Sequence, residues 1–111
     1  MITTHILDTS LGRPASGVVV TLEVHAGESW REVGRGATDA DGRLRTLVPA
    51  GDVVVAGRYR ITFDTGGYFE RSGVAAFYPE VSVTFVVGDA GQHYHVPLLL
   101  NPFGFSTYRG S

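Results

Sequence analysis

Three stretches of the chain alternate apolar and polar residues, which is the pattern of a β-strand with one buried face. The alternation covers residues 18–25, 58–65 and 81–87. In the first stretch, every second residue from Val18 to Val24 is apolar and faces the same side. We predict a strand at each of the three places.

Shorter apolar stretches predict five more strands, at residues 2–8, 30–37, 43–48, 93–100 and 105–109. Turn-forming residues separate them at 38–42, 65–67 and 88–91. Residues 68–78 are the one predicted helix, which Pro79 would end. Seven or eight short strands with turns every ~8–12 residues indicate an all-β fold, a two-sheet β-sandwich with one short helix.

Composition fits a single folded domain over residues 1–111. The chain has 111 residues and a hydrophobic fraction of 43%, which excludes intrinsic disorder. No apolar run reaches the ~18 residues of a membrane-spanning helix, so we expect no membrane association. Polar residues follow Met1 where a secretory leader would be apolar, so we expect a cytoplasmic protein.

The charged and sulfur-bearing residues narrow the chemistry further. Nine basic and eleven acidic residues give a net charge of −2, which argues against a nucleic-acid partner. The chain has no cysteine, which excludes disulfides, thiolate metal ligands and thiol nucleophiles. All nine basic residues are arginine, so Schiff-base chemistry on lysine is also excluded.

Histidines occupy two places where they could take part in a reaction. His5 lies in the first predicted strand, where a surface histidine on an edge strand is the alternative interpretation. His93 and His95 share one face if they lie in a strand, with Cα atoms roughly 6–7 Å apart. The pair suits a metal or an acid–base site, but zinc needs a third ligand that no motif supplies. Solvent-exposed alternation is the other interpretation of this pair.

Arg43 follows the turn Asp39-Ala40-Asp41-Gly42, in which Gly42 suits a positive φ. We interpret the two aspartates as turn residues, because the bidentate glutamate of a calcium loop is missing. The Arg43 guanidinium could pair with a flat, oxygen-rich ligand, although an arginine after a turn is usually solvated. A sandwich of this size has few deep clefts, so we expect a small-molecule site to need a second subunit.

The C-terminal segment carries three aromatic residues, Phe103, Phe105 and Tyr108. Chain ends normally fray. Because of these aromatic side chains, we expect this segment to pack against the protein and to hold Ser111 in place.

Together these segments resemble the transthyretin-related 5-hydroxyisourate hydrolase family over essentially the whole chain. The resemblance rests on residues 3–15, which begin Thr-Thr-His, on residues 38–43, and on residues 93–111. The final Tyr-Arg-Gly-Ser is the most specific part. Ile6 and Asp39 stand where the family frequently has valine and asparagine, and neither affects an implied role.

The resemblance implies a transthyretin-like homotetramer with active sites at the interface between dimers. It implies hydrolysis of 5-hydroxyisourate to 2-oxo-4-hydroxy-4-carboxy-5-ureidoimidazoline in urate degradation. The implied catalytic residues are His5, Arg43 and His95, and the implied substrate-binding residues are His5, Arg43, Tyr108 and Ser111. No metal or organic cofactor is expected.

The residue chemistry agrees with that implication. Water must attack the C6 carbonyl and break its bond to N1, which opens the six-membered ring. A neutral histidine, His95 or His5, could take the proton from water while the other orients water or substrate. Arg43 could bind the carbonyl edge and stabilise the oxyanion, with His93 in a structural role.

Three other interpretations remain at this stage. The same strands and turns resemble non-catalytic transthyretin-like modules with a binding or structural role. A small-ligand carrier like transthyretin would need an apolar channel, whereas His5, Arg43 and His95 would make it polar. A histidine metal site is the third alternative.

Overall fold

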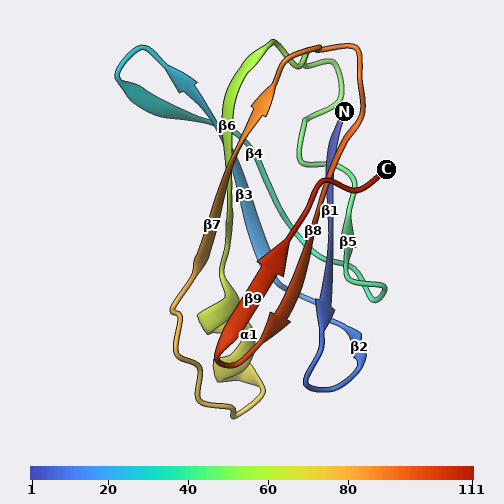
Figure 1. The fold of residues 1–111 in the computed structure, drawn as a ribbon, viewed down its shortest axis with the longest axis vertical. Coiled ribbons are helices and arrows are strands. Elements are labelled where there is room, and N and C mark those ends of the chain that lie inside the picture. The colour runs from blue at the N-terminus through green and yellow to red at the C-terminus, as the bar shows by residue number, and fades with distance from the viewer.

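Two β-sheets pack face to face in the computed structural model, which describes residues 1–111 (Figure 1). The first sheet has the order β2-β1-β8-β9, with β5 paired to β1, and the second has the order β4-β3-β6-β7. The strands of the first sheet are β1 (Ile2–Asp8), β2 (Arg13–Pro14), β5 (Arg43–Leu44), β8 (Tyr94–Asn101) and β9 (Gly104–Thr107). Those of the second are β3 (Val19–Ala26), β4 (Ser29–Ala37), β6 (Gly57–Phe63) and β7 (Val81–Val87).

The predicted two-sheet sandwich is confirmed, and the strand count differs slightly. The structure has nine strands, because the two-residue β2 was not predicted. The strand predicted at 43–48 is wrong in length, since the chain leaves the sheet after Leu44 and buries Leu47 in the core. The last strand ends at Thr107 rather than at residue 109.

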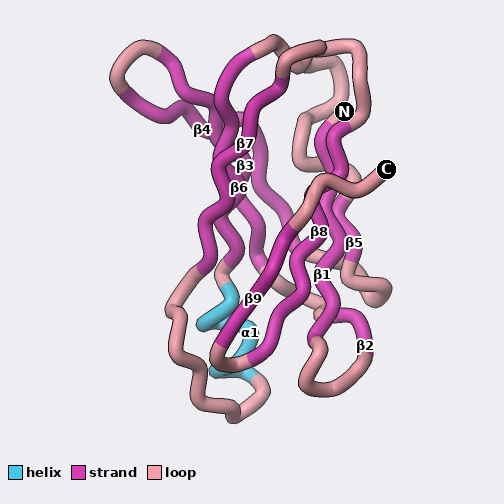
Figure 2. Tube along the Cα trace, in the orientation of Figure 1, coloured by secondary structure: helices cyan, strands magenta, loops and turns pink.

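One helix, α1 (Thr65–Arg71), lies at one end of the sandwich (Figure 2). The predicted position at 68–78 is wrong. The helix begins earlier because the Asp64 carboxylate accepts a hydrogen bond from the Gly67 amide at 3.1 Å, which caps the first turn. It ends before Gly73, whose φ of 70° leaves the helical region.

The core lies between the sheets and is made of alternate strand residues, as the sequence predicts. Val20 and Leu22 of β3 and Ile61 of β6 are fully buried from the second sheet. Ile6 of β1 and Leu98 of β8 meet them from the first sheet and are equally buried. Apolar burial of this kind is the main stabilising term of a small domain.

The first sheet joins the two ends of the chain. β1 and β8 are parallel, in register from Ile2 beside Tyr94 to Asp8 beside Leu100. Both chain ends consequently lie on the same side of the molecule (Figure 1). Thr3 therefore neighbours His95, although 92 residues separate them in sequence.

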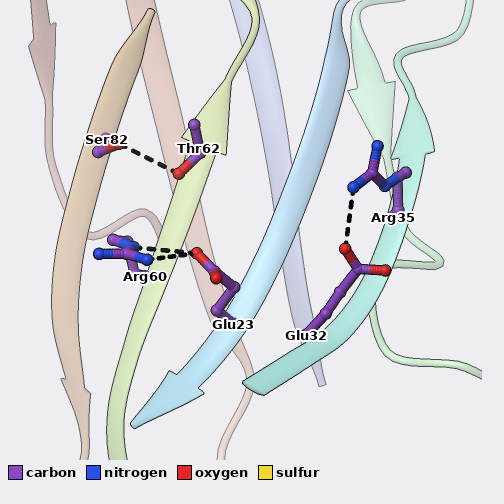
Figure 3. A network of polar contacts seen from close by, with 6 residues as sticks. All are labelled: Glu23, Glu32, Arg35, Arg60, Thr62 and Ser82. Atoms are coloured by element: carbon purple, nitrogen blue, oxygen red, sulfur yellow. Dashed lines mark hydrogen bonds and ion pairs between the residues drawn. The ribbon is translucent and has the colours of Figure 1, made fainter. Parts of the chain in front are cut away.

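The outer face of the second sheet carries polar side chains that pair with one another (Figure 3). Arg60 donates to Glu23 at 2.8 Å, and Arg35 donates to Glu32 at 3.0 Å. The hydroxyls of Thr62 and Ser82 are 3.1 Å apart. Surface pairs of this type contribute about 0–1 kcal/mol each to stability.

A buried carboxylate connects the end of β1 to α1. Asp8 is 1% exposed and accepts hydrogen bonds from the Ser10 and Leu11 amides, the Ser10 hydroxyl and the Tyr68 hydroxyl, the last at 2.8 Å. Burial alone would raise the pKa of Asp8, but these hydrogen bonds outweigh it and the pKa is lowered. Burial and the bond to Asp8 raise the pKa of Tyr68 to about 12. The pair is thus a carboxylate and a neutral phenol at pH 7.

Replacing Tyr68 with phenylalanine should lower the free energy of unfolding by about 1–3 kcal/mol at pH 7, because a buried charged oxygen loses its partner. Urea denaturation measures this. Tyr78→Phe is the matched control, since Tyr78 lies exposed against Phe105, away from Asp8.

The effect of Tyr68→Phe should depend on pH. Because the folded-state pKa of Asp8 is depressed, its stabilisation is present above about pH 4 and disappears as pH falls through the folded value. The two proteins should therefore converge in stability toward pH 2. A constant difference between pH 7 and pH 2 would contradict this role of Asp8.

Candidate active site

A polar pocket of about 340 Å³ opens on the outer face of the first sheet, beside the two chain ends. It contrasts with the paired outer face of the second sheet, because its basic groups have few protein partners. Its lining residues are Met1, Thr3, Thr4, Arg43, Arg45, His93, His95 and Ser111.

A tight turn positions Arg43 at the pocket. The Asp39 carboxylate accepts hydrogen bonds from the Asp41 and Arg43 amides, both at 2.9 Å. The bond from the Arg43 amide is the main cause that lowers the pKa of Asp39. Gly42 has a φ of 73°, and a Cβ there would collide with the Ile6 carbonyl of β1. The interpretation of these aspartates as turn residues is therefore confirmed.

His5 of β1 forms a hydrogen bond with the turn that precedes Arg43. It lies opposite Arg43 in the antiparallel pairing of β1 with β5. Its Nε2 is 2.9 Å from the Asp41 carbonyl oxygen. A carbonyl can only accept, so Nε2 carries the proton and donates. This contact leaves Nδ1 of His5 free and holds the imidazole beside the guanidinium.

His95 lies next to Thr3 in the parallel pairing of β1 with β8. Its Nδ1 is 2.8 Å from the Thr3 hydroxyl, while its Nε2 has no partner in the protein. Burial lowers the pKa of His95, and the charges of His5, His93, Arg43 and Arg45 lower it further. His95 is therefore a neutral imidazole at pH 7 with one nitrogen available.

The C-terminal segment packs closely against the His95 ring. The Gly110 amide donates to the His95 carbonyl at 2.8 Å. A Cβ on Gly110 would lie 2.6 Å from Cδ2 of His95, so only glycine allows this approach. The contact places Ser111 in the lining of the pocket.

The aromatic side chains of this segment do not pack as expected. Phe103, Phe105 and Tyr108 are 72%, 41% and 58% exposed. Backbone hydrogen bonds hold the segment instead, first through the pairing of β8 with β9 and then at Gly110. The C-terminal segment is therefore held in place as predicted, but by backbone hydrogen bonds and not by burial of its aromatic side chains.

The predicted site residues divide into three groups. Arg43, His95 and Ser111 line one pocket, and His5 adjoins it through Arg43. Tyr108 instead lines an apolar pocket of about 250 Å³ with Val83 and Phe85, so its part in the site stays a prediction.

Sequence reasoning missed Thr3 and Arg45 and gave His93 only a structural role. The alternation of β1 places Thr3 on the same face as His5, which was the available signal. Arg45 follows Arg43 by two residues, and both side chains line the pocket.

The structure contains no group of three or more histidine, cysteine, aspartate or glutamate side chains placed to hold a metal ion. His93 and His95 turn toward the same Thr3 hydroxyl. No helix is long and apolar enough to cross a membrane.

Comparison with known proteins finds 5-hydroxyisourate hydrolases and transthyretins that match nearly the whole chain. The chain is 45% identical to the 5-hydroxyisourate hydrolase of Salmonella typhimurium, over 100% of this chain and 81% of that protein. It superposes on the Klebsiella pneumoniae 5-hydroxyisourate hydrolase with a TM-score of 0.85 and 38% identity, covering 99% and 98% of the two chains. It superposes on Sparus aurata transthyretin with a TM-score of 0.91 and 32% identity, covering 98% and 95%.

The family model described as HIUase/Transthyretin family matches residues 2–110, nearly the whole chain. Similarity to both a hydrolase and a transthyretin agrees with that description. This protein therefore belongs to the HIUase/Transthyretin family.

Proposed function

We propose that this protein hydrolyses 5-hydroxyisourate in urate degradation, at the pocket that contains Arg43 and His95. The main support is the juxtaposition, on one sheet face, of a guanidinium and a neutral imidazole with a free Nε2. The full-length relatives with hydrolase names support the same reaction.

His95 is the general base. Its free Nε2 takes a proton from the water that attacks C6, a contribution typically of about 10²–10⁴-fold. His5 is less suited to this step, because its Nε2 already donates to Asp41 and its ring does not line the pocket. His5 instead holds the turn that carries Arg43, and its contact with the substrate stays a prediction from the resemblance.

Arg43 binds the carbonyl edge of the flat substrate. Its planar fork can donate two parallel hydrogen bonds, which also stabilise the oxyanion that forms at C6. Half-burial of Arg43 in the pocket strengthens this effect relative to bulk water. Ser111 adds a hydroxyl to the lining, and Tyr108 is retained as a further predicted contact. Neither the proton transfer to His95 nor the substrate binding by Arg43 requires a metal or an organic cofactor.

A homotetramer with sites between dimers completes this proposal. On one chain, apolar side chains around β7 and β9 are exposed, including Val86 and Tyr108. Exposed apolar groups of this kind typically mark a protein interface. A cytoplasmic location stays a prediction from the sequence.

Ligand carriage is the second candidate function, because the fold superposes as well on a transthyretin as on a hydrolase. The pocket on the β1–β8 face speaks against it: one of its eight lining residues, Met1, is hydrophobic, and Arg43 and Arg45 are positively charged. An apolar ligand gains little from such a surface.

Hydrolysis is tested by generating 5-hydroxyisourate freshly with urate oxidase and following its ultraviolet absorbance. The protein should accelerate the decay over the spontaneous rate. Arg43→Ala and His95→Asn should each reduce kcat/KM by about 100-fold or more. Arg35→Ala and His25→Asn on the other sheet are matched controls. No acceleration by the folded tetrameric protein would reject the proposal.

The acid limb of the activity should follow His95. Because burial and nearby positive charges lower its pKa from the usual 6.5, kcat/KM should fall with decreasing pH and reach half its plateau below pH 6.5. Arg45→Ala removes one positive charge and should move the midpoint to higher pH. A midpoint at or above pH 7 in the unaltered protein would rule out His95 as this base.

Gly110→Ala should lower kcat/KM by about 10- to 100-fold, because the added methyl must displace either the His95 ring or the C-terminal segment. Gly88→Ala is the matched control, since a Cβ there meets nothing within 4 Å. Thermal melting should show both variants folded. Full activity in folded Gly110→Ala would mean that the contact with His95 is dispensable.

A further inference from the structure

The Thr3 hydroxyl lies between two imidazoles. Its Oγ1 is 2.8 Å from Nδ1 of His95 and 3.0 Å from Nε2 of His93. Thr3 is 5% exposed, and its hydroxyl has no other protein partner. His93, in contrast, is exposed. One buried hydroxyl thus connects the half-buried imidazole of His95 to the exposed imidazole of His93, and both rings line the same pocket.

Hydrogen-bond counting couples the two rings. A threonine hydroxyl has one proton to donate and lone pairs with which to accept. A buried hydroxyl proton needs a partner, so Thr3 donates to one imidazole and accepts from the other. If His95 carries its proton on Nδ1, then Nε2 of His93 must be unprotonated. The reverse arrangement puts the His95 proton on Nε2 and removes its basic nitrogen from the pocket.

We propose that Thr3 and His93 form a proton relay that holds His95 as the Nδ1–H tautomer and carries protons from it to solvent. The inference rests on the proposed hydrolysis for its direction. In that reaction water supplies two protons. One is returned to N1 as the C6–N1 bond breaks, and the other is released because the product acid ionises.

Each relay step balances. Nε2 of His95 accepts a proton from water while its Nδ1 proton passes to Oγ1 of Thr3. The Thr3 hydroxyl proton passes to Nε2 of His93, and the exposed His93 then loses a proton to solvent. As the C6–N1 bond breaks, Nε2 of His95 gives its proton to N1, Nδ1 takes a proton back from Oγ1 of Thr3, Thr3 takes one from Nε2 of His93, and His93 takes one from solvent. This restores the starting tautomers, and the net proton released is the one that the product acid loses on ionisation. Thr3 and His93 are positioning residues here, because both act through His95, which takes the proton from water.

The surrounding charges favour outward transfer. His5 on β1, Arg43 on β5 and Arg45 just beyond it all disfavour a positive charge on His95. Arg109 of the C-terminal segment is engaged elsewhere: it lies 4.6 Å from the Tyr94 ring and donates to Gln92 at 2.8 Å. A proton gained by His95 is therefore better placed at the solvent end, on His93.

Nitrogen-15 NMR of the histidine rings tests the relay without any substrate. In the unaltered protein at pH 7.5, His95 should be the Nδ1–H tautomer and His93 should have an unprotonated Nε2. Thr3→Val removes the hydroxyl at nearly constant volume and should shift His95 toward Nε2–H. Thr3→Ser should restore the original tautomer. An Nε2–H tautomer of His95 in the unaltered protein would overturn the proposal.

Steady-state kinetics with 5-hydroxyisourate is the second test of the relay. Thr3→Val and His93→Gln should each lower kcat by about 10-fold or more with little change in KM, and Thr3→Ser should retain kcat. Added imidazole should restore kcat of His93→Gln in proportion to its concentration, which a purely structural role would not produce. His25→Gln, an exposed histidine on the other sheet, is the control.

The NMR and kinetic experiments together distinguish failure of the proposed hydrolysis from failure of the relay. If the unaltered protein does not hydrolyse 5-hydroxyisourate, the proposed function fails whatever the tautomers are. If it does, and His93→Gln keeps full kcat across pH 6–8, the relay is wrong and the hydrolysis stands.

Discussion

The parallel pairing of β1 with β8 is the contact on which the site depends. It joins strands from opposite ends of the chain in a register that sets Thr3 beside His95. The antiparallel pairing of β1 with β5 then sets His5 opposite Arg43 on the same face. A one-residue slip of β1 would turn these side chains toward the core and bring Ile6 to the surface. Burial of Ile6 and Leu98 fixes the register, so the apolar core also determines the geometry of the polar pocket.

Within that frame, the chemical state of His95 follows from its neighbours. Burial and nearby positive groups favour the neutral ring, and the Thr3 hydroxyl occupies Nδ1. Gly110 of the C-terminal segment packs against the ring at Cδ2. The β-sandwich alone does not determine the chemical state of His95, because the same fold occurs in a transthyretin. The proposed function therefore depends on the side chains of one outer sheet face, whereas polar side chains on the outer face of the second sheet pair with one another (Figure 3).

Much of this could be predicted from the sequence, for identifiable reasons. Strands such as β3 and β6 follow from alternation, because one face of each is buried. The start of α1 could not be predicted, since the cap from Asp64 overrides two glycines that favour a turn. Arg43, His95 and Ser111 were predicted by resemblance, and the structure brings them to one pocket. Thr3 was missed because only the β1–β8 pairing shows what it contacts. The exposed aromatic side chains near the C-terminus were misjudged, because backbone pairing orders that segment without them.

The most direct test of the central claim is a crystal structure of the protein with a hydrolysis-resistant analogue of the flat bicyclic substrate. The analogue should lie in the pocket on the β1–β8 face, with its carbonyl edge on the Arg43 guanidinium and the carbon to be attacked facing Nε2 of His95. An analogue bound instead in the apolar pocket lined by Phe85 and Tyr108, with Arg43 and His95 untouched, would contradict this claim.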